Sequence, residues 1–70
     1  MKKINVTTLH NQLDKLRQMI ESREDYFSER SERWQESDSG ENFEYKTQEL
    51  EGIADDLENL IDSIEEWNND

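Results

Sequence analysis

The second half of the chain carries a regular alternation of apolar and polar positions between residues 49 and 67. Its apolar residues follow one another in steps of three and four: Leu50, Ile53, Leu57, Leu60, Ile64 and Trp67. Such steps return to the same side of an α-helix, and their mean of 3.5 is that of a coiled-coil seam. The opposite side of this predicted helix is acidic, with carboxylates at Glu51, Asp55, Glu58, Asp62 and Glu65. We call these five residues the acidic stripe.

The first half of the chain keeps the same spacing without interruption. Its predicted seam runs through Val6, Leu9, Leu13, Leu16, Ile20, Arg23, Phe27, Arg30 and Trp34. The pattern predicts a first helix over about residues 7–36, a loop over residues 37–42 and a second helix over about residues 43–67. Gly40 in this loop is expected to adopt the left-handed conformation that closes a helix. Asp38 or Asn42 is expected to cap the second helix.

These elements predict a single all-α domain, an antiparallel two-helix hairpin that resembles a coiled coil. Folding back about Gly40 would place Leu16 opposite Ile64 and Ile20 opposite Leu60. Two rows of the second helix would then form its seam. One row is Phe43, Leu50, Leu57 and Ile64, and its companion is Lys46, Ile53, Leu60 and Trp67. A 70-residue helix pair has only a small core. Further apolar residues widen the stripes (Met19, Tyr26, Ala54 and Ile61), so we expect a homodimer that forms a four-helix bundle.

Composition narrows the class of protein. The chain has no cysteine and no proline, which excludes disulfides and cysteine-ligated zinc and fits uninterrupted helices. No apolar run approaches the length of a membrane span, and the N-terminal segment lacks the apolar core of a secretory signal. We therefore expect a cytoplasmic protein, or one that works in the cytoplasm of a host.

The net charge of −11 is confined to one half of the chain. Residues 1–36 contain seven basic and seven acidic residues, whereas residues 37–70 contain twelve acidic residues and only Lys46. Phosphate groups would be repelled by such a half. We therefore expect no direct binding to nucleic acid or to an anionic membrane.

Catalytic chemistry finds little support in the sequence. His10 is the only histidine and lies at the edge of the seam, and the chain has no thiol and no glycine-rich phosphate loop. Carboxylates on a solvated helix face lack the environment that tunes a general acid. The acidic residues near Asp55 and Asp62 lack the spacing of a calcium loop. We expect no enzyme activity, no cofactor and no metal site.

Arginine occupies two seam positions where leucine would be more stabilising. In a structural interpretation, the stems of Arg23 and Arg30 cover Leu57 and Leu50 while the guanidinium groups reach carboxylates at Asp56, Glu49 or Glu51. In a functional interpretation, the loop end forms a notch for a partner, with anchors at Tyr26, Arg30, Trp34, Phe43 and Tyr45. The sequence favours the structural interpretation of the two arginines.

Gly52 is unusual because it lies inside the second predicted helix. Glycine there is less favourable than alanine by about 1 kcal/mol. Either another helix approaches closely at this point, or the glycine is simply tolerated.

The acidic stripe is the feature most suggestive of a mechanism. It could simply keep a small bundle soluble. In size, charge and helical stiffness, however, the chain resembles the small acidic proteins with which phages and mobile elements imitate DNA and block restriction or other defence proteins. This resemblance implies an inhibitor that covers the basic nucleic-acid-binding surface of a partner protein. The alternative is a structural or regulatory coiled-coil module that docks through its apolar seam or its aromatic loop end.

Overall fold

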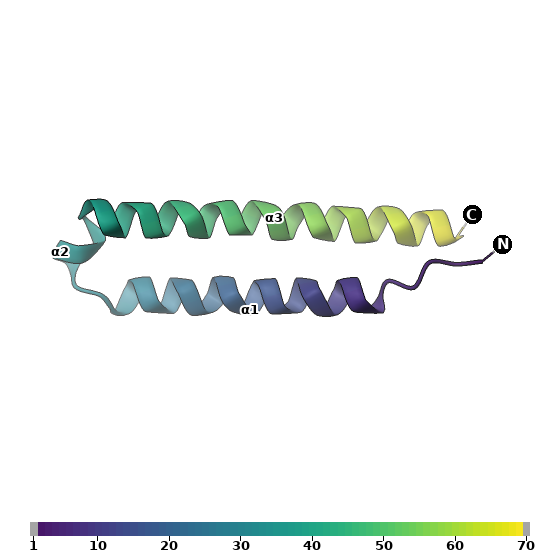
Figure 1. Ribbon diagram of the computed structural model, residues 1–70, viewed down its shortest axis with the longest axis horizontal. Coiled ribbons are helices and arrows are strands. Elements are labelled where there is room, and N and C mark those ends of the chain that lie inside the picture. Colours follow the sequence, from purple (N-terminus) through teal and green to yellow (C-terminus); the bar gives the residue numbers. More distant parts are fainter. Residues whose placement is uncertain (1, 70) are drawn as a thin grey trace.

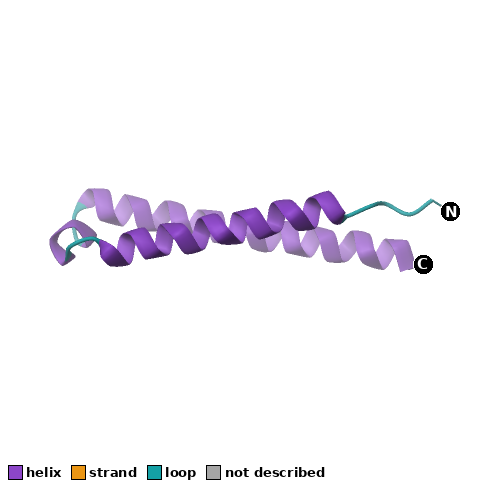
Figure 2. Ribbon diagram, turned by 90° about the horizontal axis from the view of Figure 1, so that it is seen from below, coloured by secondary structure: helices purple, strands orange, loops and turns teal. Residues whose placement is uncertain are grey.

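Three helices make up most of the computed structural model, which describes residues 2–69. α1 spans Thr7–Glu29, the short α2 spans Glu32–Gln35, and α3 spans Asp38–Asn69. α1 and α3 lie side by side and run in opposite directions, with α2 at the turn between them (Figure 1). Seen from below, the two long helices cross obliquely (Figure 2). The described residues contain no strand, so the all-α prediction is confirmed.

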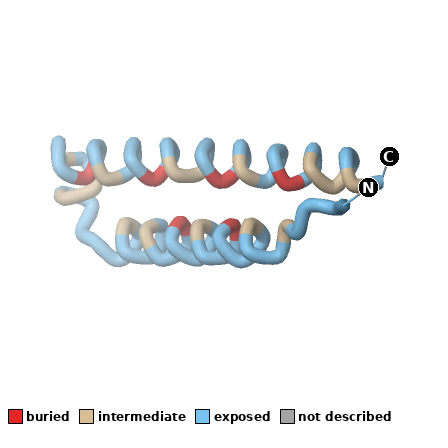
Figure 3. Tube along the Cα trace, turned by 45° about the vertical axis from the view of Figure 1, so that its right-hand side comes forward, coloured by how far each residue is buried: buried red, intermediate tan, exposed pale blue. Residues whose placement is uncertain are grey.

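The seam predicted for the first helix is confirmed along α1. Leu13 and Ile20 are buried. Between residue 6 and residue 27, the other seam positions are half-buried: Val6, Leu9, Leu16, Arg23 and Phe27. One stripe of α1 therefore meets α3, while the rest of the helix is exposed (Figure 3).

The seam of α3 combines different rows from those predicted. The expected row is half-buried and consists of Phe43, Leu50, Leu57 and Ile64. Its buried companions are Gly40, Thr47, Ala54 and Ile61. The row that was predicted to accompany it is exposed instead and consists of Lys46, Ile53, Leu60 and Trp67. Three of the four buried positions carry small side chains, so α1 can lie close to the α3 backbone along this row.

The predicted register between the two long helices is also wrong. Ile4 exchanges two hydrogen bonds with Asn68 (2.9 and 2.8 Å), and Arg17 donates to Asp55 (3.1 Å). These contacts place Ile20 at the level of the turn around Ala54 rather than Leu60. The helices are therefore displaced by about two turns from the predicted pairing.

The register differs because the chain reverses earlier than predicted. α1 ends at Glu29 rather than near residue 36, and α3 begins at Asp38 rather than near residue 43. The predicted loop at residues 37–42 is thus mostly the first turn of α3. The actual reversal uses residues 30–37, which include α2.

Two serines and a glutamine stabilise this reversal. Ser31 accepts a hydrogen bond from the backbone N–H of Trp34 (3.2 Å), and Ser37 accepts one from Gly40 (3.2 Å). Both are the contacts of an N-cap, so Ser37 performs the capping that was expected of Asp38 or Asn42. The amide of Gln35 donates to the carbonyl groups of Phe27 and Arg30 (2.9 and 3.0 Å), which satisfies acceptors at the end of α1.

Gly40 is not the helix-closing glycine that the sequence predicts. It is buried in the first turn of α3, and no described glycine has a positive φ. A Cβ atom at this position would lie 2.2 Å from the carbonyl oxygen of Trp34 and 2.7 Å from that of Gln35. Glycine is needed here because the backbone of α2 passes directly against α3.

Candidate protein-binding surfaces

The acidic stripe lies along the flank of α3 that adjoins α1. Arg17 of α1 donates from Nη2 to Asp55 (3.1 Å) and to Glu58 (2.8 Å). The His10 Nε2 atom lies 2.8 Å from a carboxylate oxygen of Glu65. These contacts join side chains that are 42–64% exposed, so each is worth only about 0–1 kcal/mol of stability. The two Arg17 contacts also offset part of the charge of the stripe.

The remaining two residues of the stripe differ in environment. Glu51 is half-buried and lies close enough to Glu24 of α1 to accept a hydrogen bond from it when Glu24 is protonated. Asp62 is exposed, and no ion pair or hydrogen bond joins its side chain to another residue within 2–69. The α1 side of this arrangement was not predicted. A signal for it was present, because the α1 row (His10, Arg17 and Glu24) and the α3 row (Glu51, Glu58 and Glu65) share a spacing of seven residues.

The Glu24–Glu51 pair makes stability depend on pH. The hydrogen bond to Glu51, then desolvation, then repulsion by neighbouring carboxylates raise the pKa of Glu24. The folded state therefore binds this proton more tightly than the unfolded state does. The contribution of the pair to the free energy of unfolding is present at low pH. It is lost as the pH rises from the ordinary glutamate pKa, about 4.3, through the raised value.

Glu24→Gln should remove this pH dependence, because glutamine keeps the hydrogen-bonding capacity without the charge. The free energy of unfolding should match that of the wild type at low pH and exceed it at neutral pH. Urea unfolding followed by circular dichroism across the acid range would measure the difference. Glu44→Gln is a matched control on an exposed part of α3 and should show no such trend. A difference that is constant across this pH range would contradict the assignment.

The residues around the chain reversal form an aromatic cluster. The ring of Trp34 on α2 lies 5.9 Å from those of Tyr26 and Phe27 on α1 and 5.8 Å from that of Phe43 on α3. The rings of Tyr26 and Phe43 are 5.2 Å apart. The Arg30 guanidinium lies 4.5 Å from the Trp34 ring centre and donates to the Tyr26 hydroxyl (3.2 Å). This cluster ties all three helices together.

Four of the five residues predicted for the loop end therefore meet: Tyr26, Arg30, Trp34 and Phe43. Tyr45 does not join them and is 63% exposed. Phe27 was not predicted as part of this end. The rings pack against one another where the helix pair reverses, but none of them is buried, and Tyr26 is 46% exposed.

Arg23 has a structural role at the same end of the molecule. Its Nε donates to the hydroxyl of Thr47 (2.8 Å), and its Nη2 donates to the carbonyl of Phe43 (3.0 Å). The guanidinium also lies 4.0 Å from the centre of the Phe43 ring. These contacts agree with the structural interpretation of Arg23. Its partners, however, are not the carboxylates that were expected. The different register of α3 brings a hydroxyl and a carbonyl to it instead.

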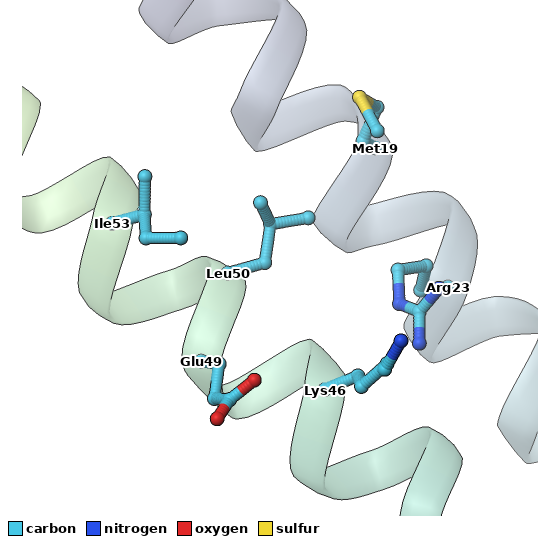
Figure 4. Close-up of a pocket in the computed structure, with 6 residues that line it drawn as sticks. All are labelled: Met19, Arg23, Lys46, Glu49, Leu50 and Ile53. Atoms are coloured by element: carbon cyan, nitrogen blue, oxygen red, sulfur yellow. The ribbon is translucent and has the colours of Figure 1, made fainter.

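A row of large apolar side chains is exposed on α3. Ile53, Leu60 and Trp67 are 56%, 54% and 47% exposed and follow one another at intervals of seven residues. Met19 of α1 is 53% exposed. It lines a shallow groove of about 240 Å³ between the long helices, together with Arg23, Lys46, Glu49, Leu50 and Ile53 (Figure 4). We call Met19, Ile53, Leu60 and Trp67 the apolar face.

The apolar face and the acidic stripe lie on opposite sides of α3. Ile53 precedes Asp55 by two positions, and Leu60 precedes Asp62 by two positions. Two positions on an α-helix correspond to a rotation of about 200°. Arg17 binds the stripe from the side of α1 that is remote from the groove. One surface can therefore be occupied while the other remains open.

Comparisons with family models, with curated proteins and with solved structures gave no significant match for this chain. Within residues 2–69, no group of three or more histidine, aspartate or glutamate side chains could hold a metal ion. None of the described helices is both long enough and apolar enough to cross a membrane.

Proposed function

We propose that this protein is a non-enzymatic helical module that acts by protein–protein binding through its apolar face. The binding unit is the antiparallel hairpin of α1 and α3. The observation that carries this proposal is the exposed row of Ile53, Leu60 and Trp67, at the seven-residue spacing of a coiled-coil seam. Large apolar patches on a soluble protein mark interaction sites.

The small core of the hairpin supports the same conclusion. Only Leu13, Ile20, Ala54 and Ile61 are buried apolar residues among those described. A domain of this length needs burial beyond such a core, or a staple, to be stable. Covering the apolar face would supply that burial in a chain that has no cysteine.

A single charge in the exposed row should abolish binding through this face. Leu60→Glu places a carboxylate where the apolar contact forms. Asn59→Glu adds the same charge one position away on the exposed surface of α3. In size-exclusion chromatography with light scattering at tens of micromolar, the wild type and Asn59→Glu should exceed the chain mass of 8.5 kDa. Leu60→Glu should give that mass while remaining helical. A wild type that stays monomeric and melts cooperatively would refute the proposal.

A second candidate function is that of an acidic inhibitor that imitates a polyanion. The exposed Asp62 and the location of the stripe opposite the apolar face favour it, because an assembled protein would still present carboxylates. The contacts of Arg17 and His10 with the stripe count against it. We therefore rank it below binding through the apolar face.

Neutralising the stripe tests this second candidate. The combined variant Glu51→Gln, Asp55→Asn, Glu58→Gln and Asp62→Asn keeps the shape of the side chains and removes four charges per chain. If the stripe imitates a phosphate backbone, this variant should fold as well as the wild type but lose affinity for a basic partner. Heparin and added salt should also displace the wild type from that partner. Equal binding by the variant, or indifference to heparin, would leave the stripe a solubilising surface.

A further inference from the structure

The dimensions of the rod suit a second copy of the same chain, an inference that rests on the proposed function. The rod measures 57 × 15 × 11 Å, and both long helices share its broad side. A broad side of these dimensions is close to the ~800 Å² that each partner buries in a standard interface. Stacking two such rods would make a bundle of four long helices.

Two closed arrangements of such a dimer are possible. If the two-fold axis runs across the helices, α3 of one copy packs on α3 of the other, and the two turns lie at opposite ends. If the axis runs along the helices, α3 of each copy packs on α1 of the other, and the two turns lie at the same end. Both arrangements are closed by symmetry, so the choice depends on charge and on the position of the apolar row.

The charge distribution favours the axis along the helices. Residues 37–70 carry the whole net charge of −11, whereas residues 1–36 are balanced. Contact between two α3 helices would place the two acidic halves of the dimer directly against each other. Contact between α3 and α1 instead brings Asp56 to the level of Lys15 of the second copy and separates the two acidic helices across the bundle. Like charges across an interface oppose association, and opposite charges support it.

The overlap of the two rods favours the same arrangement. The row extends from Ile53 to Trp67, which is the C-terminal half of α3. A two-fold axis across the helices could place the row of one copy against the row of the other only if the axis passed near Leu60. The N-terminal half of α3 would then extend beyond the partner. With the axis along the helices, equivalent residues of the two copies lie at the same height along the bundle. The rods therefore overlap over their full length.

We propose that the chain forms a homodimeric four-helix bundle whose two-fold axis runs along the helices, with α3 of each copy on α1 of the other. This arrangement predicts a definite register. Met19 of the second copy lies at the level of Ile53, and Gln12 of the second copy lies at the level of Leu60. The two turns, each with its aromatic cluster, lie side by side at one end.

A distance between the two turns tests this arrangement. The chain has no cysteine, so Arg33→Cys on the exposed surface of α2 provides a single site for a nitroxide spin label. Double electron–electron resonance should give a distance set by the width of a bundle, about 30 Å or less. Turns at opposite ends would be separated by about the rod length of 57 Å or more.

The outcomes separate this inference from the proposed function. A short distance that disappears in the Arg33→Cys, Leu60→Glu double variant supports the arrangement. A long distance in a sample of dimer mass would overturn the axis along the helices but leave binding through the apolar face intact. A labelled protein with the mass of one chain and no dipolar coupling would overturn both. Circular dichroism of the labelled protein checks that α1 and α3 have formed.

Discussion

Replacing Ile61 with alanine should lower the free energy of unfolding by about 2–5 kcal/mol. Ile61 is 1% exposed, the most deeply buried large side chain among the described residues. It lies in the row of α3 that meets α1, so its removal leaves a cavity between the two long helices. Urea unfolding followed by circular dichroism at 222 nm would measure the loss.

Leu60→Ala is the informative comparison, because the apolar pattern alone predicts that Leu60 rather than Ile61 enters the seam. Leu60 is 54% exposed in the single chain. Its truncation should therefore cost less than that of Ile61, and the cost should shrink as the protein is diluted and the apolar face is uncovered. If Leu60→Ala were the more damaging change at every concentration, the rows assigned to α3 would be wrong.

Gly40→Ala should destabilise the protein by about 1–3 kcal/mol, although alanine is the better helix former. The added Cβ would meet the carbonyl oxygen of Trp34 at 2.2 Å and the Cα of Gln35 at 2.8 Å. Both are backbone atoms, so α2 would have to move away from α3. That movement would disturb the aromatic cluster, and thermal unfolding with tryptophan fluorescence would report both effects.

Gly52→Ala is the matched control on the same helix. Nothing lies within 4 Å of a Cβ built at Gly52, so alanine should raise stability by about 1 kcal/mol through its helix propensity. The two substitutions are chemically identical and should have opposite signs. Stabilisation by Gly40→Ala would show that α2 does not pack against α3 as described. Destabilisation by Gly52→Ala would indicate that another chain approaches this point.

The sequence predicted the helices and the seam of α1 because those features depend on local periodicity. Val6 to Phe27 repeats with one unambiguous stripe, and that stripe is the one that meets α3. In α3 the row of Leu50 and Leu57 has apolar or small neighbours on both sides. Periodicity alone could not decide whether Ile53 and Leu60 or Ala54 and Ile61 would face α1.

The reversal and the register were not predictable from hydrophobic spacing. SDSGEN has the composition of a loop, but Ser37 caps a helix that includes the following residues, and Gly40 is required by the approach of α2. Moving the reversal changed which residues of the two helices meet. The pairing of Arg17 with Asp55 and Glu58, and of Arg23 with Thr47, follows from that register. The exposed state of Ile53, Leu60 and Trp67 has a different cause, because it depends on the rotation of α3 about its own axis, which turns Ala54 and Ile61 toward α1.

The concentration dependence of thermal unfolding tests most directly whether the apolar face is an assembly surface. Folding that is coupled to dimerisation makes the melting temperature depend on protein concentration. For a chain of this size, a hundredfold increase in concentration should raise the Tm by on the order of 10 °C. The Leu60→Glu variant should show no such rise. A wild-type Tm that is independent of concentration would contradict the account.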